Sequence, residues 1–313
     1  MDTVVFGRTG LDVSVVGLGC GGHSRLGQTS GAAVDDSVLL VRRALDLGIT
    51  YVDTAQAYRT EEIVGEGVRG RRDEVVISTK VSPRDRKGVL LDAEGLRAAV
   101  QTSLQKLGTD WIDVYHLHGV GDDEYGECVA ELVPELERLR DDGLIRFLAI
   151  SERFASDAGH SMLQHAVRDD CWDVMMVGFN PLNPSARDRV FPVTRETDVA
   201  IEVMFAVRRA LSRPDELARV AAELVEQGRI DGADLDLDDP LGFLVHEGGA
   251  ASVVEAAYRF ARHEPGCHVV LTGTGSVDHL EENVRSINGA PLPGADLDRL
   301  RTLFGHLDHL SGN

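Results

Sequence analysis

The 313-residue sequence contains few cysteines and few aromatic residues, and its basic residues are too few to balance its acids. Its four cysteines, Cys20, Cys128, Cys171 and Cys267, are widely spaced and form no Cys-x-x-Cys pair. This spacing argues against both a zinc site and a disulfide framework. Unpaired thiols are typical of a reducing compartment, so we expect a cytoplasmic protein.

Positive charge is scarce as well. Lys and Arg total 32 against 52 Asp and Glu, which gives a formal net charge of −20. Such an acidic surface repels phosphate backbones, and no basic block reverses the balance, so nucleic acid is not an expected partner. The sequence also has no long uncharged apolar run and no basic N-terminal region followed by an apolar segment. We therefore predict neither a membrane span nor a signal peptide.

Strand-like and helix-like apolar patterns alternate along most of the chain, after an initial hairpin pattern at Val4–Phe6 and Val13–Val15. The expected strands cover residues 15–18, 51–54, 75–81, 111–117, 145–151, 174–179, 199–207 and 268–272. The expected helices cover residues 35–47, 61–68, 92–107, 133–140, 161–167, 190–195 and 253–263. Eight such strands alternating with helices favour an α/β fold, a (β/α)8 TIM barrel forming one domain over residues 1–313.

A doubly wound sheet is the alternative architecture. That fold normally carries a glycine-rich nucleotide fingerprint after its first strand, and the cluster Gly19–Gly22 lacks the required spacing. Two segments interrupt the alternation. Residues 211–249 are too long for a plain connection and predict a partly helical insertion, acting as a lid or an interface. Residues 296–307 predict an extra C-terminal helix.

Four side chains with acid/base chemistry are expected at or near the C-terminal ends of consecutive strands. Asp53, Lys80 and His118 end three of them, and Tyr58 lies in the loop after the first. In a parallel barrel these strand ends meet on one face. A buried carboxylate needs a cation, and a phenol exchanges its proton near neutral pH only when its anion is stabilised, as by a nearby ammonium. The pattern therefore predicts an acid/base site built around Tyr58.

Motifs spaced along nearly the whole chain resemble those of the aldo-keto reductase family. They are Gly7–Ser14 with Gly17–Gly19, Asp53–Tyr58 with Glu61 and Val64–Gly65, Ser78–Lys80, Asp113–His118, and His279–Asn283. The resemblance implies a barrel that binds an extended nicotinamide dinucleotide without a Rossmann fold. It also implies that Tyr58 is the proton donor, that Lys80 lowers its pKa, that Asp53 holds Lys80, and that His118 orients the substrate oxygen.

The same resemblance implies contacts to the nicotinamide half of the cofactor. Ser151 matches the serine that holds the nicotinamide amide, whereas Glu152 and Met176 stand where the family has an asparagine and a glutamine. Phe205 matches an aromatic ring that stacks against the nicotinamide. Arg208 follows shortly after and can neutralise the pyrophosphate.

Residues 271–276 precede a predicted helix start near Val277, where backbone amides and hydroxyls can hold a phosphate. The resemblance implies cofactor contacts here from Gly273, Thr274, Ser276, His279, Glu282 and Asn283. Glu282 and Asn283 match the pair that reads the adenine. Gly273 and His279 stand where many members carry the Lys and Arg that grip a 2′-phosphate. We expect NADP(H) because the family favours it, with NAD(H) as the alternative.

The expected function is NAD(P)(H)-dependent reduction of an aldehyde or ketone, or oxidation of the corresponding alcohol or sugar, on a small and polar substrate. The altered residues Glu152 and Met176 leave a second hypothesis, a nucleotide-binding barrel acting as a sensor or partner subunit. A third is a metal-dependent barrel hydrolase using His116 and His118, which share one strand face. Lys80 beside Asp53 would repel a divalent ion, so no metal is predicted. The sequence does not indicate an oligomeric state.

Overall fold

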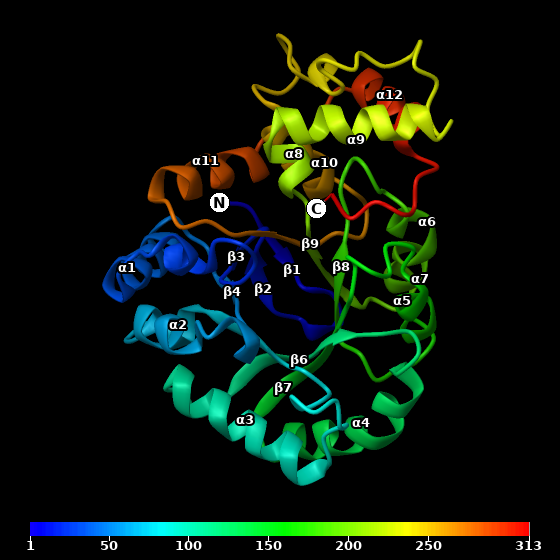
Figure 1. Cartoon of the computed structure of the whole chain (residues 1–313). Coiled ribbons are helices and arrows are strands. Elements are labelled where there is room, and N and C mark those ends of the chain that lie inside the picture. Colours follow the sequence, from blue (N-terminus) through cyan, green and yellow to red (C-terminus); the bar gives the residue numbers. More distant parts are fainter. Residues whose placement is uncertain (313) are drawn as a thin grey trace.

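A computed structural model describes residues 1–312 and contains a closed barrel of eight parallel strands surrounded by helices (Figure 1). The strands, in barrel order, are β3 (Val16–Gly19), β4 (Tyr51–Asp53), β5 (Val76–Val81), β6 (Ile112–Val120), β7 (Ile145–Glu152), β8 (Val174–Gly178), β9 (Ala200–Met204) and β10 (Val269–Thr272). Strand β10 pairs with β3 and closes the ring. The predicted (β/α)8 barrel is therefore confirmed.

Helices connect the strands and cover the outside of the barrel. They are α1 (Val34–Asp46), α2 (Glu61–Val68), α3 (Ala93–Leu107), α4 (Tyr125–Asp141), α5 (Ser161–Ala166), α6 (Ala186–Arg189), α7 (Phe191–Glu196), α10 (Val253–Arg262) and α11 (Val277–Ile287). Most boundaries fall within two residues of the expected ones. Helix α4 begins eight residues before the expected start at residue 133, and Pro134 lies inside it.

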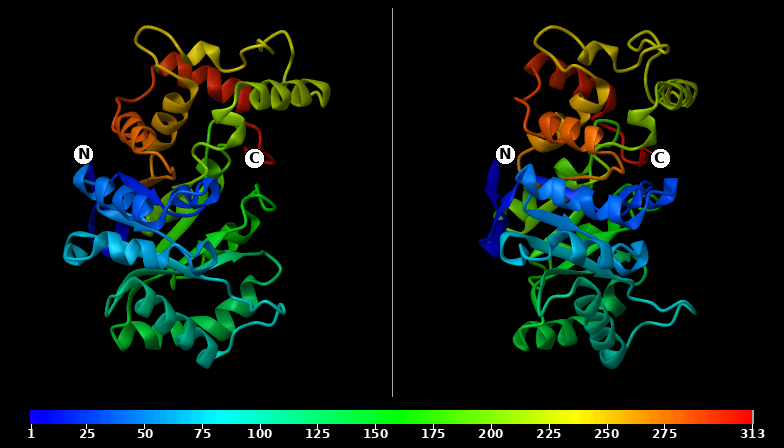
Figure 2. Two further views of the ribbon diagram at one scale, coloured as in Figure 1. Left: turned by 60° about the vertical axis from the view of Figure 1, so that its left-hand side comes forward. Right: turned by 90° about the vertical axis from the view of Figure 1, so that its left-hand side faces the viewer.

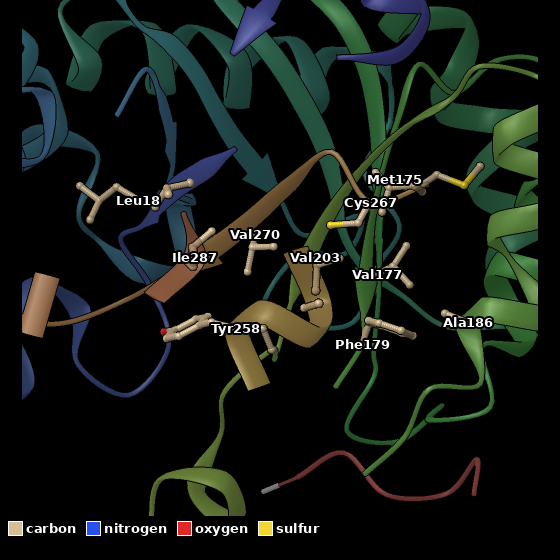
Figure 3. Close-up of a cluster of buried hydrophobic side chains, with 14 of the residues drawn as sticks. Leu18, Met175, Val177, Phe179, Ala186, Val203, Tyr258, Cys267, Val270 and Ile287 are labelled. Atoms are coloured by element: carbon tan, nitrogen blue, oxygen red, sulfur yellow. The ribbon is translucent and has the colours of Figure 1, made fainter. Parts of the chain in front are cut away.

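The core has two parts, one outside and one inside the barrel wall. Outward side chains of the strands, such as Leu18, Val203 and Val270, pack with helix residues such as Tyr258 and Ile287 (Figure 3). Inside the barrel, apolar residues of the strands form a separate cluster together with Phe6 and Val13 of the N-terminal segment. Parallel strands that are buried on both faces have continuous apolar runs in the sequence. These runs allowed the strands to be predicted.

An N-terminal hairpin closes one end of the barrel. Strands β1 (Thr3–Val5) and β2 (Asp12–Ser14) pair antiparallel, as predicted, with Val4 opposite Val13. Phe6 follows β1, is fully buried, and meets the Tyr51 ring edge-on at 5.2 Å between centroids. The hairpin thus covers the end where the strands begin, and leaves the end where they finish for a site.

The insertion contains α8 (Arg209–Ser212), α9 (Pro214–Glu226) and a 3-10 turn, η5 (Gly242–Leu244). Figures 1 and 2 show α9 and the extra C-terminal helix α12 (Gly294–Phe304) at the same end of the molecule. The imidazole of His306, just after α12, donates a hydrogen bond to the carbonyl of Arg229 at 2.8 Å. The role of the 211–249 insertion as a lid or an interface stays a prediction. No helix within residues 1–312 is both long enough and apolar enough to cross a bilayer.

Candidate active site

A buried ion pair joins two neighbouring strands at the open end of the barrel. Lys80 on β5 donates from Nζ to Asp53 Oδ1 on β4, and also to the carbonyl of Thr54 at 2.9 Å. Ser78 donates to the same Asp53 oxygen at 2.9 Å. Lys80 has no exposed surface, and Asp53 is 3% exposed. The carboxylate therefore compensates a cation that would otherwise be costly to bury.

Tyr58 is held by the short 3-10 turn η3 (Gln56–Tyr58) that follows β4. The side-chain amide of Gln56 donates to the Ala99 carbonyl at 2.7 Å and to the Ser103 hydroxyl at 2.9 Å, which ties the turn to helix α3. The next residue, Arg59, has a φ of +58° and turns the chain back toward α2. The position of the phenol is thus fixed by the contacts between this turn and helix α3.

Residues after β3 fix the Tyr58 side chain from another direction. Arg25 donates from Nε to the Tyr58 carbonyl at 2.9 Å, and its Nη2 contacts the same oxygen. Gly21 lies flat against the ring, since a Cβ there would come within 2.3–2.6 Å of three ring carbons. Only glycine fits this contact without moving the ring.

The four predicted acid/base residues lie together. The Tyr58 hydroxyl is 3.2 Å from Nε2 of His118, and the two rings meet edge to face with centroids 5.3 Å apart. The Lys80 Nζ lies 5.0 Å from the centre of the Tyr58 ring. Asp53 contacts Lys80 from behind. Three strand ends and one turn therefore converge on a single phenol.

Burial and neighbouring charge set the protonation states of these groups. Burial, followed by the Lys80 cation and His116, lowers the pKa of His118 to about 3, so its imidazole is neutral at physiological pH. Burial raises the pKa of Tyr58, and the Lys80 cation opposes that rise. Burial raises the pKa of Asp53 to about 6, against the effect of Lys80. Burial alone would lower the pKa of Lys80, but Asp53, Tyr58 and Glu202 together outweigh it and raise the value. The ion pair is consequently charged at neutral pH.

His116 does not pair with His118 as a metal-ligand set. It lies inside the barrel, where its Nε2 is 2.7 Å from Oε1 of Glu202 on β9. Potential ligand atoms of Asp53, His116 and Glu202 lie within 4.8 Å of one another. The Lys80 ammonium already contacts Asp53, and its positive charge opposes a divalent cation at this position.

Ser151 and Glu152, at the end of β7, have different hydrogen-bond partners. Ser151 accepts a hydrogen bond from the Gly119 amide at 2.8 Å, which leaves its own hydroxyl hydrogen able to donate. The Glu152 carboxylate accepts from the Gly178 amide at 2.7 Å and contacts Nδ1 of His160 at 2.9 Å. Because both of its partners lie within the protein, Glu152 does not replace the missing amide anchor.

Phe205 and Arg208 form a stacked unit after β9. Residues 199–207 were expected to be one strand, but β9 ends at Met204 and Phe205 has a φ of +64°. The Phe205 ring meets Phe154 edge-on at 5.5 Å, and the Arg208 guanidinium lies 4.1 Å above it. Burial lowers the pKa of Arg208, while the Tyr58 group opposes this shift, which relates Arg208 electrostatically to the Tyr58 phenol.

The predicted phosphate-binding segment lies between β10 and α11. Gly273 and Gly275 allow close backbone contacts, since a Cβ would lie 3.0 Å from the Gly19 carbonyl in the first case and 2.5 Å from Gly27 in the second. Ser276 caps α11 by accepting from the His279 amide at 3.4 Å, and the Ser276 amide donates to Thr274 at 3.1 Å.

Further along α11, the polar residues divide between solvent and the interior. His279 and Glu282 are exposed. Asn283 donates to the Thr272 hydroxyl at 2.8 Å. The hydroxyls, the amides and this eleven-residue helix fit a phosphate-bearing ligand.

Two residues with close contacts to the site escaped sequence reasoning. Arg25 holds Tyr58 through the backbone, and no motif marks it. Glu202 was hidden in an expected strand, although a signal existed, because an acid in the middle of the apolar run Ala200–Met204 must point into the barrel or out toward a helix. The structure places it inside.

The aldo/keto reductase family model matches residues 18–303. The uncharacterized oxidoreductase YqkF of Bacillus subtilis is 26% identical over 308 residues, covering 95% of this chain and 94% of that protein. L-galactose dehydrogenase of Arabidopsis thaliana is 35% identical over 152 residues, covering 46% of each chain. A solved aldo/keto reductase from Klebsiella pneumoniae, in complex with NADP and acetate, has a TM-score of 0.68 at 23% identity and covers 96% of this chain and 95% of its own.

Proposed function

Because the chain belongs to the aldo/keto reductase family and is therefore an oxidoreductase, we propose that it uses NADP(H) to reduce an aldehyde or ketone, or to oxidise the corresponding alcohol or sugar. The observation that carries the proposal is the 3.2 Å contact between the Tyr58 hydroxyl and His118, beside the buried Lys80–Asp53 pair. The reductase from Klebsiella pneumoniae that holds NADP, and the dehydrogenase that acts on L-galactose, support the cofactor and the substrate class.

In this mechanism the nicotinamide cofactor, when bound, supplies the hydride. The substrate oxygen lies at the Tyr58 hydroxyl and the His118 imidazole. Because His118 is neutral, one ring nitrogen can donate a hydrogen bond to the substrate oxygen. The ring does not give up a proton to that oxygen, so Tyr58 remains the proton donor. Tyr58 keeps its proton until negative charge develops on the oxygen, and then donates it. In alcohol oxidation the same phenolate accepts the proton.

Lys80 and Asp53 act on Tyr58 electrostatically. The ammonium stabilises the phenolate that remains after proton transfer, and Asp53 keeps that ammonium charged and fixed in position. Both groups are buried, where such interactions are stronger than in water. The Lys80–Asp53 pair thus allows the Tyr58 phenol to act as a proton donor near neutral pH.

The remaining predicted residues would hold the cofactor. Ser151 offers its hydroxyl to the nicotinamide amide, Phe205 offers its aromatic ring, and Arg208 places a cation beside that ring. The segment Gly273, Thr274 and Ser276 would receive a phosphate at the start of α11, with His279, Glu282 and Asn283 toward the adenosine end. NAD(H) is the alternative cofactor, because neither Gly273 nor His279 is a Lys or Arg.

The substitution Tyr58→Phe tests this proposal. It removes the proton donor and keeps the ring against Gly21, so we expect turnover to fall by about 10²–10⁴-fold. Binding of NADPH, measured by fluorescence titration, should stay within about twofold. Loss of turnover and cofactor binding together would contradict the assigned role. Tight cofactor binding by the unmodified protein, with no turnover of any aldehyde, ketone or sugar in a broad panel, would instead favour a nucleotide-binding barrel.

A further inference from the structure

A second pair of ionisable side chains lies inside the barrel, one layer below the Tyr58 site. His116 on β6 and Glu202 on β9 come from strands separated by β7 and β8, so they meet across the barrel interior. Neither residue has exposed surface. Their Nε2 and Oε1 atoms are 2.7 Å apart. This pair has no part in the mechanism described above.

The pair is in direct reach of the catalytic groups. Strand register places His116 beside Lys80, and His118 lies two residues further along the same strand. One oxygen of Asp53, one oxygen of Glu202 and one nitrogen of His116 lie within 4.8 Å of one another. The titratable groups that act on these side chains are Tyr51 and Asp53 from β4, Lys80 from β5, His118 from β6 and Tyr58 from η3.

Charge balance in this interior favours a proton on the pair. Asp53 and Glu202 are two carboxylates, and Lys80 supplies a single permanent cation. An unbalanced negative charge in a fully buried space is strongly unfavourable. A proton on His116 makes the four groups neutral together.

The geometry agrees with an ion pair. The Nε2 atom of His116 and the Oε1 atom of Glu202 approach to 2.7 Å, and both side chains are fully buried. Burial raises the pKa of Glu202, but His116 and Lys80 outweigh it and lower the value. Glu202 in turn adds to the rise in the pKa of Tyr58.

We propose that His116 and Glu202 form an ionised positioning pair, which keeps the barrel interior neutral and so controls when Tyr58 can release its proton. The inference rests on the proposed function, because it assigns the pair a role toward the same tyrosine. Neither residue touches the substrate oxygen, and both act through the charges at Asp53 and Lys80.

The pH profile of carbonyl reduction tests this role. In His116→Gln, the Glu202 carboxylate is unbalanced and disfavours the Tyr58 phenolate, so the alkaline limb should move up by about one pH unit. The double variant His116→Gln/Glu202→Gln removes both charges and should return the limb to its original position. Val174→Ala is the control, because it opens space in the barrel interior without changing charge. The proposed role of the His116–Glu202 pair is overturned if the alkaline limb does not move in His116→Gln, or if it moves equally in Val174→Ala.

A second measurement is independent of turnover. Nitrogen-15 NMR of the histidine-labelled, unsubstituted protein at pH 7 should show His116 with both ring nitrogens protonated, and Glu202→Gln should convert it to a neutral ring. A neutral His116 in the unsubstituted protein overturns the inference even if the enzyme is active. A cationic His116 in a protein that turns over no carbonyl or alcohol would overturn the proposed function instead, and leave the ion pair established.

Discussion

The neutral state of His118 predicts a specific loss of stability in acid. Its pKa falls from 6.5 to about 3 in the folded chain, so the folded protein binds fewer protons than the unfolded chain between these values. Stability therefore rises with pH across this window and falls as pH is lowered through it. At pH 5 an unfolded histidine is almost fully charged while His118 stays neutral. This one group should cost about 2 kcal/mol of unfolding free energy between pH 7.5 and pH 5.

The perturbation that isolates this contribution is His118→Gln, which keeps a hydrogen-bonding side chain and removes the titration. Denaturant unfolding at pH 7.5 and pH 5 would give the free energy of unfolding for both proteins. We expect the unsubstituted protein to lose about 2 kcal/mol more than the variant on acidification. His23→Gln is the control, because His23 is exposed and its removal should leave the pH dependence unchanged.

Equal pH dependence in the unsubstituted protein and in His118→Gln would refute the reasoning. It would mean that His118 takes up its proton in the folded state as readily as in the unfolded chain. The imidazole would then be cationic during turnover in mild acid, and the assignment of a neutral hydrogen-bond donor to the substrate oxygen would have to be withdrawn.

Two further substitutions test the supports of the site. Asp53→Asn leaves the Lys80 ammonium buried without its carboxylate, which should lower the unfolding free energy by about 3–5 kcal/mol. Denaturant titration at pH 7.5 measures this change. A change below about 1 kcal/mol would show that the ion pair is not needed for stability. Gly21→Ala places a methyl group within 2.3–2.6 Å of the Tyr58 ring, so turnover should fall at least tenfold while circular dichroism shows a folded protein. Gly126→Ala is the control. It has no atom within 4 Å of the new methyl group and should keep full activity.

Sequence reasoning found the fold and the meeting of Asp53, Lys80 and His118 for the same physical reason. Buried parallel strands leave uninterrupted apolar runs, and parallel register brings the residues that end those runs to one face. The environment of Glu152 could not be found this way, because its partners His160 and Gly178 are set by the packing of α5 and β8 around it. The early end of β9 also depends on tertiary contacts.

Phe205 illustrates a conflict between local conformation and placement of a side chain. Its φ of +64° lies in the left-handed region, which costs a residue other than glycine about 1–2 kcal/mol, and its carbonyl accepts from Asn180 at 3.2 Å. A random library at this position, sorted only for resistance to heat, would accumulate glycine or asparagine. Under the nicotinamide contact proposed above, the same library sorted for catalysis would keep an aromatic ring at position 205, so the two selections would favour different residues.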